Sequence, residues 1–252
     1  KKLGWVYETE AAGRRISVNY YVWTDVFNCP ECVHEFPFFP HGVIHHGNKV
    51  QTKKQFECPS CGAELNVRKV ERVLTTEGKK KSLAWVNAGS GRSRINREPN
   101  AFDLDIVRNV KTALQDTSLW IPSDEIDPAG YSAKLAQLGD KAITDVSRFL
   151  SERNRLVFAD LWQRMTEIED TSIRNAIRSC LTSIFTVISE RQGYFGGGGG
   201  MSGNLYMPIV RMEKNIYDSL RRKIKKFIDA ESEKPLNHEG HLVTTQSATK
   251  LD

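Results

Sequence analysis

Four of the five cysteines stand in two Cys-x-x-Cys pairs, a spacing that lets one tight turn point two thiolates at the same metal ion. The pairs are Cys29 with Cys32 and Cys58 with Cys61, and 25 residues separate them. Proline after the first cysteine and glycine after the last suit this turn geometry. Two such turns complete a tetrahedral shell of four sulfur ligands. We therefore predict a zinc ion bound by Cys29, Cys32, Cys58 and Cys61.

A shell of four thiolates is closed, so the predicted metal has a structural role and activates no water. An iron–sulfur centre uses the same ligands, and the cysteine pattern fits either metal. Disulfides are disfavoured because nothing marks the chain as secreted, and we expect a cytoplasmic protein with reduced thiols. Four histidines lie between the pairs at irregular spacing, and we expect no ligand or catalytic role for them: His34, His41, His45 and His46. Cys180 lies in an apolar helical pattern and is predicted to be core.

Positive charge is concentrated in one stretch of the 252-residue chain, which has 36 Lys and Arg against 31 Asp and Glu overall. Residues 68–97 hold nine basic and two acidic residues, and a smaller basic cluster lies at 221–226. Because the rest of the chain is nearly neutral, this cluster of positive charge indicates a surface that binds a polyanion. The alternative is a loop whose charges are simply solvated. Within this stretch we expect Trp85 to pack in a small core in preference to stacking on a base. The candidate contact residues are Lys79, Lys80, Lys81, Trp85, Arg92, Arg94 and Arg97.

The elements around these residues predict an α+β chain, with an N-terminal β zinc ribbon followed by a mainly α-helical domain. Strand-like runs precede both cysteine pairs, at 20–23 and 55–57, and another is expected at 82–87. Apolar residues at helical spacing predict a helix over 102–114 and a helical hairpin whose two helices are capped by Ser151 and Asp170. A last amphipathic helix is expected to begin at Pro208, and no stretch is apolar enough to cross a membrane. The predicted regions are a zinc ribbon at 1–74, a basic loop and strand region at 75–101, a helical domain at 102–192, a glycine-rich loop at 193–207, and a helix with a strand-like tail at 208–252.

The order of several short motifs resembles the central insert of a family of bacterial DNA amino-methyltransferases, which modify adenine-N6 or cytosine-N4. The resemblance covers nearly the whole chain. Its most distinctive part is Tyr194-Phe195, five glycines from Gly196 to Gly200, and the run from Met201 to Pro208. Without the resemblance, the glycine tract reads as a flexible linker. The other matching motifs are 23–27 (Trp-Thr-Asp-Val-Phe), 56–65 around the second cysteine pair, Phe149 with Arg153-Asn154, Leu161-Trp162, and 245–249 (Thr-Gln-Ser-Ala-Thr).

Two motifs of that family are missing from this chain. No catalytic Asp-Pro-Pro-aromatic motif occurs in it, and no Phe-x-Gly-x-Gly cofactor loop precedes its first predicted strand. The resemblance therefore implies a target-recognition segment without catalytic or cofactor-binding residues, with S-adenosylmethionine needed only by a full-length enzyme. The implied partners are duplex DNA and the catalytic domain of the same parent chain. The alternative is a zinc-ribbon adaptor that binds a protein partner through its helical half.

Overall fold

The computed structural model describes residues 3–46, 49–76, 78–136, 138, 143–194 and 205–233. The glycine tract and the strand-like tail predicted from the sequence lie outside the described residues. The β elements are β1 (Glu8–Ala11), β2 (Arg14–Asn28), β3 (Glu35–Pro37), β4 (Val43–His46), β5 (Lys49–Thr52), β6 (Gln55–Glu57), β7 (Glu64–Asn66), β8 (Glu71–Arg72), β9 (Leu74–Thr75), β10 (Gly78–Lys79), β11 (Lys81–Ala88), β12 (Ile95–Arg97) and β13 (Val210–Lys214). The helices are α1 (Phe39–Gly42), α2 (Ala101–Gln115), α3 (Tyr131–Leu135), α4 (Glu152–Thr166), α5 (Thr171–Ser183), α6 (Phe185–Ile188) and α7 (Ile216–Glu233), with 3₁₀ turns at Gly4–Tyr7, Gly91–Ser93 and Val146–Phe149.

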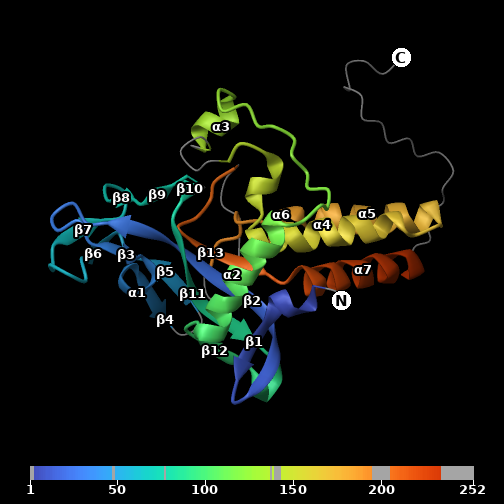
Figure 1. The fold of residues 1–252 in the computed structure, drawn as a ribbon, viewed down its shortest axis with the longest axis horizontal. Coiled ribbons are helices and arrows are strands. Elements are labelled where there is room, and N and C mark those ends of the chain that lie inside the picture. The colour runs from blue at the N-terminus through green and yellow to red at the C-terminus, as the bar shows by residue number, and fades with distance from the viewer. Residues whose placement is uncertain are drawn as a thin grey trace.

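One long strand organises the antiparallel sheet (Figure 1). β2 has 15 residues, about 50 Å of extended chain, and it pairs with different partners along its length. Its start pairs with β1, its middle with β11 and β13, and its end with β3 and β8. The predicted α+β class is confirmed, and β2 links the cysteine-bearing region to the sheet under the helices.

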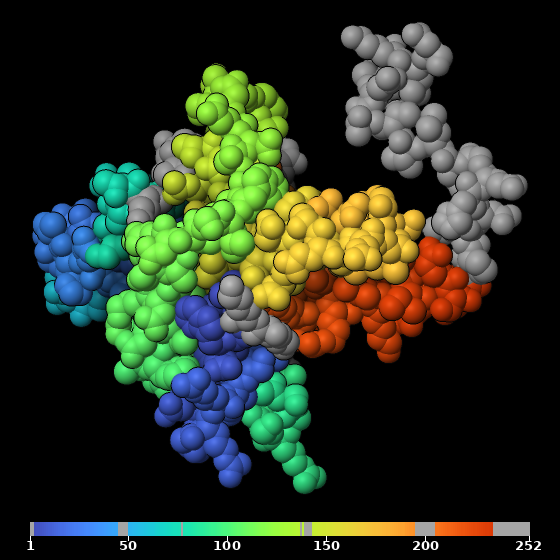
Figure 2. All heavy atoms as spheres, turned by 45° about the vertical axis from the view of Figure 1, so that its right-hand side comes forward, coloured from blue at the N-terminus to red at the C-terminus, as the bar shows by residue number. Residues whose placement is uncertain are grey.

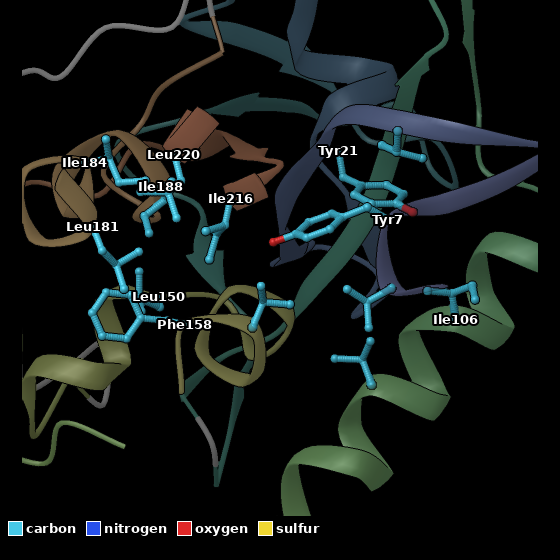
Figure 3. Packing of buried hydrophobic residues seen from close by; sticks show 14 of the residues in the cluster. Tyr7, Tyr21, Ile106, Leu150, Phe158, Leu181, Ile184, Ile188, Ile216 and Leu220 are labelled. Atoms are coloured by element: carbon cyan, nitrogen blue, oxygen red, sulfur yellow. The ribbon is translucent and has the colours of Figure 1, made fainter. Parts of the chain in front are cut away.

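Successive residues of β2 point into two different hydrophobic cores, as the alternation of a strand requires. Tyr21 joins the larger core, which α2, α4, α5, α6 and α7 cover. Figure 3 shows part of this core, with Tyr7 and Tyr21 side by side and Ile216, the first residue of α7, among the labelled core residues. Val22 joins the second core, which also contains Cys29 and Cys58. The middle of β2 is therefore buried on both faces.

Helices α4 and α5 begin where the sequence predicts. The side chains of Ser151 and Asp170 accept hydrogen bonds from backbone N–H groups of α4 and α5. These two helices contact each other as the predicted hairpin, and Cys180 on α5 is buried. α2 spans the predicted helix at 102–114 and begins at a capping box formed by Asn100 and Asp103. None of the described helices is both long and apolar enough to cross a membrane.

The prediction that a helix begins at Pro208 is wrong. Residues Val210–Lys214 form β13, and α7 begins only at Ile216. β13 pairs antiparallel with β2 from Val210 opposite Thr24 to Lys214 opposite Tyr20, so a strand edge supplies its hydrogen bonds. Residues near the C-terminus thus complete the N-terminal sheet.

Candidate metal centre and nucleic-acid interface

Each Cys-x-x-Cys pair lies in the turn of a β-hairpin. The first pair follows β2 and precedes β3, and the second joins β6 to β7. In both turns, the N–H of the first cysteine donates to the carbonyl five residues on. Its own carbonyl accepts the N–H four residues on, from Val33 or Gly62, at 2.9 and 3.0 Å. The two turns therefore have the same backbone conformation, with φ of 59° at Val33 and 74° at Gly62.

The four sulfur atoms converge on one point between the hairpins. All four lie within 4.8 Å of one another. The Sγ of Cys29 is 3.7 Å from that of Cys61, and the Sγ of Cys32 is 3.7 Å from that of Cys58. Zinc–sulfur bonds of about 2.3 Å in a tetrahedron place sulfurs about 3.8 Å apart, whereas a disulfide requires about 2.05 Å. The cysteines thus fit one tetrahedral metal ion and are compatible with structural zinc.

The backbone around Cys58 favours the thiolate form of that cysteine. Burial raises the pKa of Cys58, but the backbone N–H groups of Cys61 and Ser60 outweigh it and lower that pKa to about 6. The Ser60 N–H lies 3.4 Å from the Cys58 sulfur. Because the thiolate is the form that binds metal, Cys58 is suited to bind an ion. At Cys61 the backbone N–H of Ala63 lowers the pKa, but burial and the other three thiols outweigh it and raise that pKa to about 12. A layer of phenylalanine rings packs beneath the hairpins, formed by Phe27, Phe36, Phe38 and Phe56.

The histidines of the intervening loop were expected to take no part in the metal site. The rings of His34 and His41 both pack near the ring of Phe36. Burial, with help from nearby Lys53, lowers the pKa of His41. The metal-binding cluster found among the described residues contains cysteines alone. The side chains of His45 and His46 lie outside the described residues.

The basic stretch at 68–97 is divided into two separate places by β11. Lys79, Lys80 and Lys81 lie at its start, and Arg92 and Arg94 lie beyond its end. Eight residues of strand span about 25 Å, which corresponds to about seven base pairs of duplex DNA. Residues that are neighbours in the sequence pattern therefore form two surfaces at opposite ends of one strand.

At the first end, the lysines meet carboxylates from distant elements. Lys80 pairs with Glu35 on β3, and Lys81 pairs with Glu190 after α6. Trp85 is partly buried in the core that contains the cysteines, and its ring centre lies 6.0 Å from that of Phe39. The expectation that Trp85 packs in a small core is confirmed.

At the other end, the turn between β11 and β12 exposes Arg92 and Arg94. Gly89 opens this turn at φ 73°, and a Cβ there would lie 2.5 Å from the carbonyl oxygen of Ser93, so the turn requires glycine. Arg97 has a different setting. Its guanidinium donates to the buried carboxylate of Asp103 at 2.7 Å and to the Thr9 hydroxyl at 2.6 Å. Arg97 thus ties the start of α2 to β1.

The structure adds two arginines that the sequence reasoning missed. Arg14 and Arg15 are exposed and follow the Ala12–Gly13 turn between β1 and β2. The Gly89 N–H donates to the Ser17 carbonyl at 3.0 Å, so the two hairpins are neighbours. Figure 2 shows their tips, blue and blue-green, projecting from the same end of the molecule. A two-residue turn followed by paired arginines was the available signal, but the near-neutral balance of residues 1–67 obscured it.

Comparison with protein-family models, with curated proteins and with solved structures finds no match for this chain.

Proposed function

We propose that this chain is the DNA-binding target-recognition segment of a DNA amino-methyltransferase, stabilised by a structural zinc ion. The two hairpins that carry Arg14 and Arg15 on one tip and Arg92 and Arg94 on the other, here named the arginine hairpins, are its main contact with duplex DNA. The catalytic domain of the parent chain would supply S-adenosylmethionine and the transfer chemistry.

The arginine hairpins carry the proposal because three of their four arginine charges form no ion pair among the described residues. Arg14, Arg92 and Arg94 are exposed, and no carboxylate in the described part of the chain forms an ion pair with them. Arg15 is partly engaged, since Glu8 lies 3.4 Å away. A two-stranded ribbon can enter the major groove, where a guanidinium can bind guanine O6 and N7 or a phosphate.

The methyltransferase part of the proposal depends on the motif resemblance alone, and three of the motif residues also have buried roles in the fold. Glu213 on β13 accepts hydrogen bonds from Trp23 at 2.6 Å and from Arg153. Asn154 accepts a hydrogen bond from the Tyr7 hydroxyl at 2.6 Å. Trp23 and Arg153, which come from two of the motifs, therefore share Glu213 as a partner.

The test is a salt series of duplex binding, followed by fluorescence anisotropy. Changing Arg14, Arg92 and Arg94 together to Gln should weaken binding at least tenfold. It should also reduce the salt slope by about 2.7, because each lost phosphate contact contributes about 0.9. The matched control removes three exposed charges from α7, at Arg222, Lys225 and Lys226, and should leave the slope unchanged.

Two outcomes would overturn the proposal. Wild-type protein that binds no duplex at low salt would remove the DNA function. Loss of binding in the α7 variant alone would move the interface to that helix. The gene around this segment tests the parentage separately, because the proposal requires Phe-x-Gly-x-Gly before it and Asp-Pro-Pro-aromatic after it.

The adaptor alternative has one observation in its favour. The paired helices α5 and α7 expose large apolar side chains, namely Ile173, Phe227 and Ile228. Exposed apolar residues on such helices suit a protein partner. If this alternative holds, polar substitutions at these three positions abolish capture of a purified partner domain, and duplex DNA binding is absent at every salt concentration.

A further inference from the structure

Three asparagine side chains form a row across β2, β11 and β12, next to the arginine hairpins. The Nδ2 of Asn19 donates to the Oδ1 of Asn87 at 2.8 Å, and the Nδ2 of Asn87 donates to the Oδ1 of Asn96. Asn87 is buried, whereas Asn96 is exposed. The row therefore leads from the interior of the sheet to its surface, and the contact between arginines and phosphates does not explain it.

A backbone carbonyl fixes the direction of the hydrogen bonds in this row. The Nδ2 of Asn19 also donates to the carbonyl oxygen of Gly89 at 2.8 Å, and a carbonyl oxygen can only accept. The orientation of the Asn19 amide is therefore set, and the same nitrogen donates to Asn87. Because Asn87 accepts with its oxygen, it donates with its nitrogen, and Asn96 can only accept from it.

Asn96 consequently presents a donor beside an acceptor at the surface. Its Nδ2 donates to no group in the described part of the chain, and its Oδ1 has a second lone pair. Ile95, the preceding residue of β12, packs against the larger core, so alternation along the strand turns Asn96 to the opposite face of the sheet. Buried partners thus orient this exposed amide before any ligand binds.

Arg94 lies on the same face of the sheet, two residues before Asn96. Burial raises the pKa of Tyr20 to about 12, and the positive charge of Arg94 opposes this increase, so the guanidinium lies near the Tyr20 side chain. Tyr20 is opposite Asn87 in the pairing of β2 with β11, and opposite residues share a face. Two residues of strand span about 7 Å, which corresponds to about two base pairs of duplex DNA. Arg94 and Asn96 can therefore contact positions about two base pairs apart.

We propose that Asn96 reads an adenine in the major groove when the arginine hairpins bind duplex DNA. Adenine presents a donor at N6 beside an acceptor at N7, and one amide can bind both. Guanine presents two acceptors there, and neither cytosine nor thymine presents a donor beside an acceptor. Asn96 is thus a specificity-determining residue, while Arg94 anchors the ribbon next to it. This assignment rests on the DNA binding proposed above, to which it adds the recognition of a base.

The test selects bound sequences from a duplex pool with a randomised centre and then measures affinity for the selected duplex by fluorescence anisotropy. Wild type should select an adenine at one position, and replacing this A·T pair by G·C should weaken binding at least about fivefold. Replacing the adenine by 7-deazaadenine, which lacks the N7 acceptor but still pairs with thymine, should weaken binding about threefold. For Asn96→Ala, neither change in the DNA should alter the affinity.

Asn96→Asp separates base recognition from a structural role of the asparagine row. Its carboxylate still accepts from Asn87, so the urea midpoint should stay close to that of wild type. It can no longer donate to N7, and it should select cytosine, whose N4 group donates, in place of adenine. The matched control is Ser90→Asp in the exposed turn of the same hairpin, which adds the same charge. It should weaken binding to all sequences by one factor and keep the adenine preference.

Failure of this assignment can be distinguished from failure of the DNA proposal. If wild type binds duplex DNA but selects no adenine, or if Asn96→Ala keeps the selection, Asn96 reads no base and the arginine hairpins remain a contact without sequence preference. Loss of the adenine preference in Ser90→Asp as well would attribute the effect to charge and overturn the assignment. If wild type binds no duplex at low salt, both proposals are wrong.

Discussion

Replacing Glu213 by leucine should greatly destabilise the fold, because its carboxylate is buried at the centre of a charged cluster. Glu213 is 3% exposed and Arg153 is 2% exposed. The carboxylate accepts hydrogen bonds from Arg153, Ser151 and Trp23. The guanidinium of Arg153 lies 3.8 Å above the centre of the Tyr21 ring. Removing the carboxylate leaves a buried cation without its counter-charge.

Breaking a buried ion pair from one side costs about 3–5 kcal/mol in the free energy of unfolding. For a chain of this size, each kcal/mol lowers the melting temperature by about 2–4 °C, so a fall of about 6–20 °C is expected. Removing the charges of both Glu213 and Arg153 should cost much less free energy of unfolding. Arg153→Met combined with Glu213→Leu should recover most of the loss, because the pair no longer has to be desolvated and methionine can pack on Tyr21.

The assay is urea unfolding followed by circular dichroism at a fixed zinc concentration, since metal binding is coupled to folding. Glu35→Leu is the matched control. Glu35 pairs with Lys80, and both side chains are nearly half exposed, so the change should stay within about 0.5 kcal/mol. A Glu213→Leu protein within 1 kcal/mol of wild type would refute the reasoning, as would a double variant no more stable than the single one.

Three further predictions concern the metal turns and the acid limit of the fold. Cys58→Ser should lower the bound zinc measured by elemental analysis and loosen the ribbon, whereas Cys180→Ser, in the helical core, should leave the zinc content unchanged. Val33→Gly should raise stability by about 0.5–1 kcal/mol, because a β-branched residue at φ 59° costs about 1–2 kcal/mol and the added freedom of glycine offsets part of the gain. Gly62→Val, with no atom within 4 Å of the new Cβ, should lose stability through backbone strain alone. If urea unfolding shows that Val33→Gly is less stable than wild type, or that Gly62→Val is more stable, this explanation is contradicted. Burial raises the pKa of Glu190, but Lys81 and Arg211 bring it below its ordinary value of 4.5. The contribution of Glu190 to the free energy of unfolding should therefore be complete above about pH 4.5 and disappear as the pH falls through the lower pKa of the folded state. If wild type stays more stable than Glu190→Gln by the same amount throughout the acid range, this prediction is wrong.

Part of this structure was predictable because the determining interactions are local in the chain. The Cys-x-x-Cys spacing places two sulfurs within one turn, so the sequence indicated all four metal ligands that the structure brings together. Helix caps are equally local, and the hydrogen bonds of Ser151 and Asp170 span three residues. The strand at 82–87 followed from its composition and corresponds to β11.

The failed prediction at Pro208 has a specific cause. Apolar residues at Val210, Met212 and Ile216 fit one face of a helix. The alternation of apolar and charged residues from Val210 to Lys214 also fits a strand. This segment is a strand because its five residues pair with the edge of β2, which lies about 190 positions earlier in the chain. Hydrogen bonding between such distant segments leaves no local signal, so only the folded chain shows it.

The basic surface illustrates the same division. The sequence by itself determined that positive charge gathers at 68–97 and that four thiolates can share a metal. The tertiary structure decided how those charges are used. It assigns Arg97 to Asp103 and places the hairpin of Arg92 next to that of Arg14. It also separates both hairpin tips from Lys81 by the length of β11. Composition fixes how much charge a segment carries, whereas its position and its partners depend on strand pairing and burial across the whole chain.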